Sequence, residues 1–383
     1  MCHVVTTLTT GGAETALLRL LRTDAMSDFE SSVVCLGEDG PVASEIRALE
    51  IPVVTLGIQS VSDGLRHAPR LVRIVAGLGP DLIQGWMYHG NVAALFADTF
   101  TGGARRCAWN VRHGLHALDT EAYATRFLIE LGRWLSRWVD AGIYNSQMAA
   151  DQHRDRGYHE VCREVVHNGF DVACFRPDRG AYSEVRRELG LGPEAVLVGH
   201  VGRNHPVKGQ DLFLEAMAQV EHPDVWFVLA GRRVDWSTTA LARKVTRLGL
   251  SDRVRLLGER RDMPRFMASL DVLVSSSRSE AFPNVVGEAM AAGVPCVVTD
   301  VGDCAELVGD GGIVVPPGRP DALAQGTQTL LGMPAERRVA LGTVGRRRIE
   351  EHFSLEGMGR AYASLYKRLL LRTPATGSGL CVV

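Results

Sequence analysis

Two cationic side chains lie in a short loop that follows a predicted strand near the middle of the chain. The segment from 201 to 209 reads VGRNHPVKG and carries Arg203 and Lys208. Gly202 permits the turn, and a guanidinium with an ammonium supplies the charge-assisted donors that a diphosphate requires. A solvated basic loop without a ligand is the alternative. We predict that Gly202, Arg203 and Lys208 form a phosphate site.

A second candidate segment has no basic residue of its own. Residues 279–318 contain no Lys, Arg or His, although they contain several carboxylates. The turn SRSEAFP at 277–283 precedes a predicted helix at 284–292, and the N–H groups at a helix start favour an anion. A phosphate bound at this turn would therefore need Arg203 and Lys208 for its neutralisation.

Glu288 is a carboxylate within this otherwise apolar predicted helix. No basic residue occupies a neighbouring helical position from which it could pair with Glu288. A buried carboxylate needs hydrogen-bond donors, and the hydroxyls of a ribose are suitable ones. An exposed carboxylate on the outer face of the helix is the alternative.

Three features of the N-terminal half are candidates for the acceptor side or the cleft. Gly11 and Gly12 separate a predicted strand from a predicted helix, where they allow close approach of a ligand or simply make a tight turn. His89 follows a predicted strand in the run WMYHGN, and His113 follows the next one in WNVRH. Because the chain has 12 histidines, a structural role is the default for each of them. The position of His89 favours it over His113.

The segment 123–139 combines apolar side chains and arginines at helical spacing. The apolar members are Phe127, Leu128, Leu131, Trp134, Leu135 and Trp138, and the basic ones are Arg126, Arg133 and Arg137. Such a helix could rest on an anionic bilayer and serve a lipid-linked acceptor. It also fits a core helix whose arginines reach out to solvent. The first interpretation predicts peripheral contact with the inner face of a membrane.

Short apolar runs alternate with helical stretches along the chain, which predicts parallel sheets with βαβ crossovers. The predicted strands of the first half are 3–7, 33–35, 53–56, 82–85, 106–109 and 141–145. A cluster of turn residues at 168–180 interrupts this alternation. The predicted strands of the second half are 195–201, 225–230, 254–257, 272–275, 296–299 and 313–315.

This pattern predicts an α/β protein with two Rossmann-like, doubly wound parallel-sheet domains at 1–175 and 180–350. A final helix at 355–371 is expected to pack back on the first domain, and residues 373–383 are expected to be unstructured. Two such domains face each other across a cleft at the carboxyl ends of their strands, where ligands bind in open α/β sheets.

The composition excludes several other classes of protein. The net charge of -2 gives no electrostatic case for nucleic-acid binding, and no uncharged apolar run approaches the roughly 20 residues of a membrane span. The eight cysteines form no C-x-x-C pair, and the first eight residues lack the basic start of a signal peptide. We therefore expect a reduced, cytoplasmic protein.

The residues named above carry a resemblance to family 4 of the retaining glycosyltransferases, which have the two-domain GT-B fold. The resemblance rests on Gly202 and Arg203 with Lys208 and Gly209, on Glu280 and Glu288 at E-x7-E spacing, and on EAMAxGxP from 288 to 295. It extends to Gly302-Asp303-x-x-Glu306, to HNGFD at 167–171 and to GGAE at 11–14.

The resemblance implies transfer of a hexose or N-acetylhexosamine, with retention, from a nucleotide-sugar to a carbohydrate or lipid-linked acceptor. Arg203 and Lys208 would hold the donor diphosphate, Glu288 its ribose, and His89 would contact the donor sugar. The donor sugar would be approached by Glu280, Ala281, Phe282 and Pro283. Ala281 and Asp303 replace glycines that are usual in the family, which bears on the identity of the sugar.

We expect no cofactor and no metal, because the chain contains no D-x-D sequence that could hold a metal-bridged diphosphate. Three other functions share this layout. A nicotinamide-dependent oxidoreductase would need G-x-G-x-x-G after a strand, which is lacking. A nonhydrolysing sugar-nucleotide epimerase and a catalytically silent sugar-nucleotide-binding module stay open.

Overall fold

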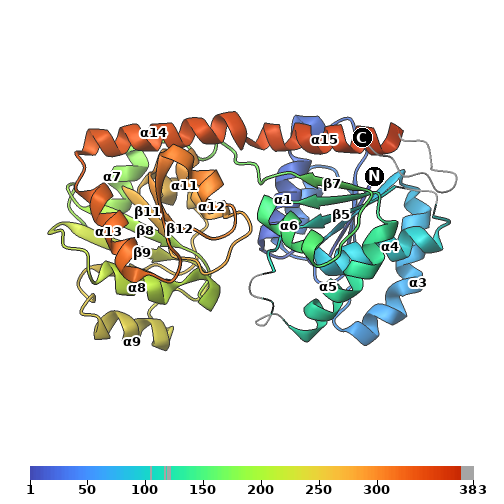
Figure 1. Cartoon of the computed structure of the whole chain (residues 1–383), viewed down its shortest axis with the longest axis horizontal. Helices are drawn as coiled ribbons and strands as arrows, with labels where there is room; N and C mark the ends of the chain where they lie inside the picture. The colour runs from blue at the N-terminus through green and yellow to red at the C-terminus, as the bar shows by residue number, and fades with distance from the viewer. Residues whose placement is uncertain (104–105, 116–117, 119–121, 372–383) are drawn as a thin grey trace. The chain divides into compact units, whose positions relative to one another are not determined.

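The computed structural model describes residues 1–103, 106–115, 118 and 122–371, without the side chains of 61 and 62. The tail at 373–383, expected to be unstructured, lies outside the described residues. The chain divides into two compact units (Figure 1). The N-terminal unit comprises Met1–Gly169 with Leu355–Val383, and the C-terminal unit comprises Phe170–Ser354.

In the described part of the N-terminal unit, seven strands form a parallel sheet in the order β3-β2-β1-β4-β5-β6-β7. The strands are β1 Cys2–Val5, β2 Ser32–Cys35, β3 Val53–Thr55, β4 Leu82–Trp86, β5 Arg106–Val111, β6 Ala141–Tyr144 and β7 Cys162–Val165. The helices are α1 Gly12–Leu21, α2 Pro41–Arg47, α3 Val61–Leu78, α4 Met87–Phe100, α5 Tyr123–Leu135, α6 Gln147–Asp155 and α15 Leu355–Leu371, with 3-10 turns η1 Asp24–Met26 and η3 Ser136–Trp138.

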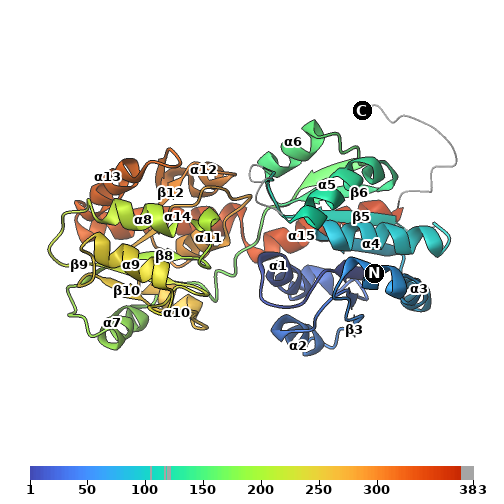
Figure 2. The same ribbon diagram turned by 90° about the horizontal axis from the view of Figure 1, so that it is seen from below.

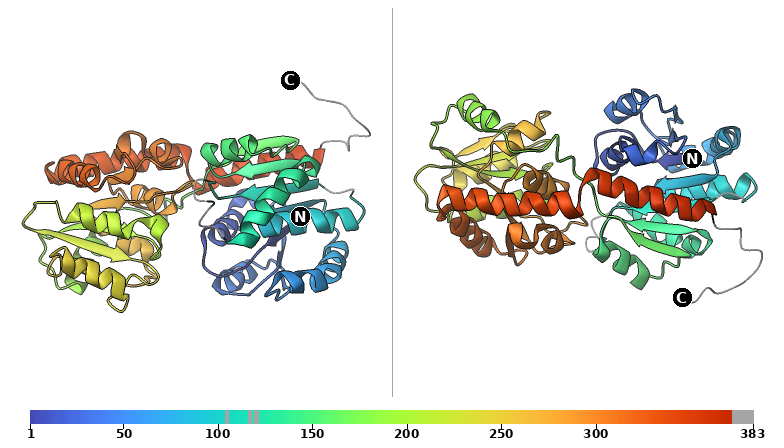
Figure 3. Two further views of the ribbon diagram at one scale, coloured as in Figure 1. Left: turned by 60° about the horizontal axis from the view of Figure 1, so that its bottom comes forward. Right: turned by 90° about the horizontal axis from the view of Figure 1, so that it is seen from above.

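Side chains alternate between the two faces of this sheet along each strand, and helices pack on both faces. Val5 packs with residues of α1, α2 and α15, whereas its neighbour Val4 packs with residues of α3 and α4. Figure 3 (right) shows α15 lying over the strands of this unit. The last helix of the chain is therefore part of the N-terminal core, through side chains such as Tyr362 and Tyr366.

In the described part of the C-terminal unit, six parallel strands follow the order β10-β9-β8-β11-β12-β13. They are β8 Val196–Val201, β9 Val225–Ala230, β10 Val254–Leu256, β11 Val272–Ser275, β12 Cys296–Thr299 and β13 Gly312–Val315. The helices are α7 Arg179–Glu188, α8 Gln210–Met217, α9 Thr239–Arg247, α10 Met263–Ala268, α11 Asn284–Ala291, α12 Cys304–Val308, α13 Pro320–Leu331 and α14 Ala335–His352, with 3-10 turns η4 Pro206–Lys208 and η5 Gly309–Gly311.

The same alternation builds two apolar layers in this unit. Leu197 packs with residues of α7, α10, α11, α12 and α14, and the next residue, Val198, packs with residues of α8, α9 and α13. The sequence prediction of two Rossmann-like, doubly wound parallel sheets is therefore confirmed for both units.

Several strand bounds shift by one or two residues, and two elements differ more substantially from the sequence predictions. β7 was missed because its four residues, CREV, are all half-buried at the edge of the sheet and lack an apolar run. The helix predicted at 123–139 ends at Leu135, and a 3-10 turn continues it to Trp138. The 3-10 turn ends before Val139, which is fully buried.

Other composition-based expectations concern cysteines and membrane spans. Seven of the eight cysteines lie among the described residues, and all seven are free thiols, as predicted. Cys381 lies outside the described residues. Across the part of the chain that the structure describes, no helix is long and apolar enough to cross a membrane.

Candidate functional site

The predicted phosphate loop connects β8 to α8 in the C-terminal unit. Gly209, which precedes α8, has φ 65, and a Cβ there would lie 2.1 Å from the carbonyl oxygen of Ser276. Only glycine combines this left-handed backbone with so close an approach. The hydroxyl of Ser276 donates a hydrogen bond of 2.7 Å to the carbonyl of Gly209. The loop after β8 is thus held against the loop after β11.

His200 supports the same loop from within the sheet. Its Nε2 lies 3.0 Å from the carbonyl oxygen of Lys208, and the side chain is buried. Burial lowers the pKa of His200 to about 4, so the imidazole is neutral at pH 7. The Nε2–H therefore donates to the carbonyl and fixes the backbone from which the Lys208 side chain extends.

Lys208 forms an ion pair with Glu280, the first glutamate of the E-x7-E motif. Lys208 Nζ lies 2.6 Å from Glu280 Oε1, and the hydroxyl of Ser277 donates to the same oxygen at 2.7 Å. Only 11% of the Glu280 side chain and 26% of the Lys208 side chain are exposed. The structure therefore brings together these two predicted site residues, one from each loop.

Arg203 lies at the carboxyl end of β8, and its guanidinium is exposed. Its carbonyl accepts a hydrogen bond of 2.8 Å from the side-chain amide of Gln210, which fixes the backbone. Among the ion pairs of the described residues, none includes Arg203. The loop therefore presents one cation paired with Glu280 and one cation that an incoming anion can engage.

The turn that carries Glu280 rests on the segment after β12. Gly302 has φ 59, and a Cβ there would lie 2.4 Å from the carbonyl oxygen of Glu280 and 2.6 Å from that of Ala281. The backbone N–H of Asp303 donates to the carbonyl of Ala281 at 3.0 Å. The backbone of Gly302 and Asp303 therefore packs directly against the turn and stabilises it.

Helix α11 begins at Asn284, directly after the buried residues Phe282 and Pro283 of this turn. No side chain caps its first turn. Glu288 lies on α11 and is only 9% exposed, which excludes the outer-face alternative considered for this carboxylate. Its contact with a ribose stays a prediction.

The HNGFD motif contributes a packing residue to the same region. Phe170 lies against Gly287, where a Cβ would approach the ring to 2.0 Å, and its ring stacks on Phe282 with a centroid separation of 6.2 Å. Gly287 precedes Glu288 on α11. The aromatic ring of Phe170 therefore fixes both the turn and the helix that carry predicted donor-binding residues.

Four supporting residues of this site were missed by sequence reasoning: Ser276, Ser277, His200 and Gln210. Their signal was weak, because a serine run at 275–277 and a histidine inside an apolar strand are both common in cores. Thr299 was missed as well, although its hydroxyl donates to the carbonyl of Ser277 at 2.6 Å.

In the N-terminal unit, Gly11 caps the start of α1 and Gly12 is its first residue. A Cβ on Gly11 would lie 2.3 Å from a carboxylate oxygen of Glu14, and Glu14 accepts a hydrogen bond of 2.9 Å from the Thr7 hydroxyl. The side chain of Glu14 therefore folds back over the glycine loop, which explains the need for glycine at 11. Gly12 is exposed.

His89 lies in the first turn of α4. Met87, at φ 60, makes a left-handed turn that is uncommon for a residue with a side chain. A Cβ on Gly90 would lie 2.5 Å from the carbonyl oxygen of Val4, so α4 begins in close contact with β1. Burial lowers the pKa of His89, which is therefore neutral at pH 7.

The neighbour of His89 is fixed by a buried histidine. His153 Nδ1 lies 2.7 Å from the carbonyl of Ala149, which places the proton on Nδ1 and leaves Nε2 to accept from the Tyr88 hydroxyl at 3.0 Å. The ring of His113 meets the ring of Tyr88 edge-on at 6.2 Å. Tyr88, which precedes His89 in the chain, therefore contacts both His153 and His113.

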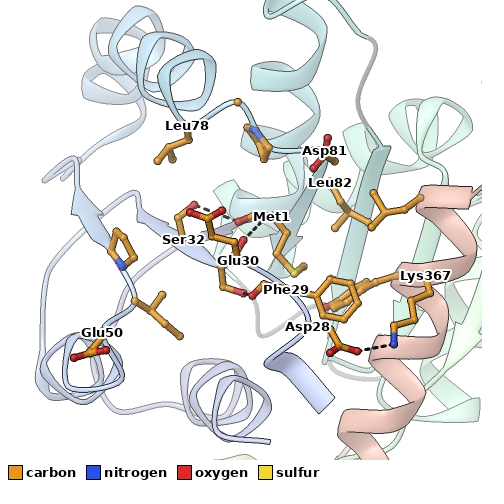
Figure 4. A pocket seen from close by; sticks show the side chains of 17 residues that line it. Met1, Asp28, Phe29, Glu30, Ser32, Glu50, Leu78, Asp81, Leu82 and Lys367 are labelled. Carbon is orange, nitrogen blue, oxygen red and sulfur yellow. Dashed lines mark hydrogen bonds and ion pairs between the residues drawn. The ribbon is translucent and has the colours of Figure 1, made fainter. Parts of the chain in front are cut away.

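A pocket in the N-terminal unit has none of Gly11, Gly12, His89 and His113 in its lining (Figure 4). It opens at the amino ends of the strands, next to Met1, Ser32 and Leu82, and its wall includes the ion pair between Lys367 and Asp28. Ligands of open α/β sheets bind at the carboxyl ends instead. We therefore do not assign this pocket to the predicted site.

Two family models match the chain. One, described as Glycosyltransferase Family 4, matches residues 10–173, and the other, described as Glycosyl transferases group 1, matches residues 195–333. The second match contains the whole segment from Gly202 to Gly302 that builds the candidate site.

Two curated bacterial proteins are similar to the chain over most of their length. The lipopolysaccharide core biosynthesis mannosyltransferase LpsB of Rhizobium meliloti is 32% identical over 247 residues, which cover 62% of this chain and 68% of LpsB. The lipopolysaccharide core biosynthesis mannosyltransferase LpcC of Rhizobium leguminosarum bv. viciae is 34% identical over 246 residues, which cover 62% of this chain and 67% of LpcC.

Solved structures share the fold. The crystal structure of Anabaena Alr3699/HepE in complex with UDP has a TM-score of 0.82 and 25% identity, with coverage of 96% of this chain and 99% of HepE. The structure of WaaG, a glycosyltransferase involved in lipopolysaccharide biosynthesis, has a TM-score of 0.70 and 15% identity. At this identity, the similarity to WaaG shows a shared fold only.

Proposed function

Because the chain belongs to glycosyltransferase family 4, we propose that it transfers a hexose from a nucleoside-diphosphate sugar bound mainly by its C-terminal unit. The transfer would proceed with retention, as sequence resemblance to the family implies. The observation that carries this proposal is the pairing of Lys208 with Glu280 across two adjacent loops, beside the accessible guanidinium of Arg203.

The proposed donor is a UDP- or GDP-sugar. HepE was solved in complex with UDP, and LpsB and LpcC are named mannosyltransferases. The diphosphate would contact Arg203 and Lys208, with Gly202 allowing close approach of its oxygens. Glu288 would accept hydrogen bonds from the ribose hydroxyls, because it is buried and lies one turn into α11.

Donor cleavage breaks the bond between the sugar C1 and the diphosphate oxygen. Negative charge then develops on the leaving diphosphate, where Arg203 and Lys208 stabilise it more strongly than in the ground state. The acceptor hydroxyl oxygen would form the new bond to C1, and the leaving phosphate would take the proton of that hydroxyl. Glu280, with the backbone of Ala281 and Phe282 and with Pro283 beside it, would orient the sugar.

We assign the acceptor side to the N-terminal unit. The neutral imidazole of His89, the exposed Gly12 beside Gly11, and His113 are the groups proposed to meet the reacting sugars. The acceptor would be a carbohydrate or a lipid-linked sugar of cell-surface polysaccharide or lipopolysaccharide synthesis, in line with the names of LpsB and LpcC. Such an acceptor favours a cytoplasmic enzyme at the inner face of a membrane.

The test is a panel of UDP-, GDP-, ADP- and dTDP-sugars in which the released nucleoside diphosphate is followed. Release from one donor, increased by extracts that supply an acceptor and absent in Glu288→Ala, is the expected result. Conversion of the donor into another sugar nucleotide without release would favour the epimerase. Binding without consumption of any donor, under all acceptor conditions, would favour the silent binding module.

A further inference from the structure

Helix α5 and the following turn η3 carry an exposed face of mixed aromatic and basic character. Its members, which we call the aromatic-arginine face, are Tyr123, Phe127, Trp134 and Trp138 with Arg126, Arg133 and Arg137. We propose that this face docks on an anionic lipid bilayer. The inference deepens the proposed function, on which it rests, by naming the surface that would bring the enzyme to a membrane-bound acceptor.

The exposure of the aromatic side chains is the first observation. Tyr123 is 84% exposed, Phe127 57%, Trp134 58% and Trp138 64%. Large apolar groups that gather on a single surface of a soluble unit mark an interaction site. Four such groups within 16 consecutive residues, counted from 123 to 138, therefore call for a partner with an apolar component.

The spacing places the two kinds of side chain in parallel stripes. Positions 123, 127 and 134 differ by four and seven residues and therefore share one side of the helix. Positions 126 and 133 also differ by seven residues and lie beside the aromatic stripe. A helix of this type lies in the interface plane, with its aromatic stripe toward the acyl chains and its basic stripe toward the headgroups.

The opposite side of α5 packs on the unit. Ile129 and Gly132 are buried, and Tyr158 places its hydroxyl at the Ile129 carbonyl, 2.8 Å away. Helix α5 also lies beside α4 in the views of Figures 1 and 2. The interpretation of 123–139 as a core helix therefore holds for Ile129 and Gly132, but not for Phe127 or Trp134.

Within the described residues, the arginines of this face have no ion-pair partner. No ion pair of the described residues includes Arg126, Arg133 or Arg137, whereas Glu130, in the same stripe, pairs with Arg156. The guanidinium of Arg137 lies 5.3 Å from the Trp134 ring centroid and 5.7 Å from that of Trp138. The guanidinium of Arg133 also lies 5.5 Å from the Trp134 ring centroid, so two of the three arginines lie beside aromatic rings.

This combination favours lipid over protein or nucleic acid as the partner. Lipid phosphates accept bidentate hydrogen bonds from guanidinium groups, and tryptophan and tyrosine rings concentrate at the headgroup level of bilayers. Anionic headgroups add attraction for each arginine near the surface. Because the whole chain carries a net charge of -2, its attraction to anionic headgroups depends on local basic groups such as those of this face.

The test is co-flotation of the full chain with phosphatidylcholine vesicles, with and without phosphatidylglycerol, combined with tryptophan fluorescence. Binding is expected only with phosphatidylglycerol, together with a blue shift that is lost in Trp134→Phe/Trp138→Phe. Replacing Arg126, Arg133 and Arg137 by Gln should weaken binding roughly a hundredfold.

The matched control is the variant in which Arg66, Arg70 and Arg73 are replaced by Gln. These three arginines are exposed on α3, and their replacement removes the same total charge. It should bind as the unchanged chain does. Equal losses in both variants, or binding that does not depend on phosphatidylglycerol, would overturn the proposal. Because neither readout involves turnover, an inactive enzyme that still binds vesicles would refute the proposed function and leave the docking face intact.

Discussion

Lys208 Nζ lies 2.6 Å from Glu280 Oε1, although the two residues are 72 positions apart in the chain. The cation proposed to bind the donor diphosphate is thus already paired with the carboxylate proposed to orient the donor sugar. Because the pair is largely shielded from water, its attraction is stronger than that of an exposed pair. A diphosphate that engages Lys208 must compete with Glu280 or share the ammonium with it.

Replacing Glu280 by Gln should separate binding from catalysis. The ammonium of Lys208 loses its anionic partner, so a nucleoside diphosphate should bind about fivefold more tightly, equivalent to roughly 1 kcal/mol. Turnover should fall about a hundredfold, because the donor sugar loses an orienting carboxylate. Calorimetric titration with the diphosphate measures the change in affinity, and a turnover assay measures the change in rate. Weaker binding in the variant would show that Glu280 does not compete for Lys208.

Replacing either Arg203 or Lys208 by Ala should lower turnover by roughly a hundredfold or more, because both groups are assigned to charge that develops in the transition state. Arg243→Ala on α9, another exposed arginine of the C-terminal unit, is the matched control and should keep its activity. Initial rates at saturating donor measure the effect. Near-normal rates in both site variants would refute their role.

Gly302→Ala should disturb the turn that holds Glu280. Its added Cβ would collide with the Glu280 carbonyl at 2.4 Å, in addition to the penalty of about 1 kcal/mol for a left-handed residue with a side chain. Gly318→Ala is the control, because Gly318 has φ 71 but faces open space. Urea unfolding should show a larger loss for Gly302→Ala, and only this variant should lose turnover. Equal losses of stability with full activity in both would contradict the account of the turn.

Stability should decrease as pH falls from about 6.5 toward 4. Burial lowers the pKa of His153 and of His200 from 6.5 to about 4, so the unfolded chain binds protons in this range that the folded chain does not. Within this pH range, each histidine should lower the free energy of unfolding by about 1.4 kcal/mol for each unit by which the pH falls. Above pH 6.5, neither histidine should make the free energy of unfolding depend on pH. Urea unfolding at several pH values measures the slope.

His200→Gln isolates one of these contributions. The amide can still donate to the Lys208 carbonyl, but it does not titrate. Between pH 6.5 and 4, the free energy of unfolding of this variant should therefore depend less steeply on pH, by the contribution of one histidine. Activity at neutral pH should be retained. An unchanged slope would show that His200 is protonated in the folded chain.

Much of the fold could be predicted from the sequence because both sheets consist of apolar runs of the expected length. β9, β11 and β12 have the predicted bounds, and α15 begins and ends where periodicity placed it. β7 could not be recognised, because an edge strand with half-buried residues does not need an apolar run.

The contacts within the candidate site were less predictable. Arg203, Lys208, Glu280 and Glu288 could be selected by residue type and motif spacing, but the pairing of Lys208 with Glu280 depends on how two loops meet. The packing of Phe170 against Gly287 also joins segments distant in sequence. Helix α5 is the clearest example of what the sequence does not determine, because its periodicity alone does not predict which of its apolar residues face solvent.

The most direct test of the central claim is calorimetric titration of the chain with UDP and GDP, with Glu288→Ala and Lys208→Ala measured alongside. We predict binding of one nucleoside diphosphate with a single site per chain, weakened in both variants while their folding is unchanged. Absence of binding by either nucleotide, or equal affinity in the unchanged chain and both variants, would contradict a donor site built from these residues.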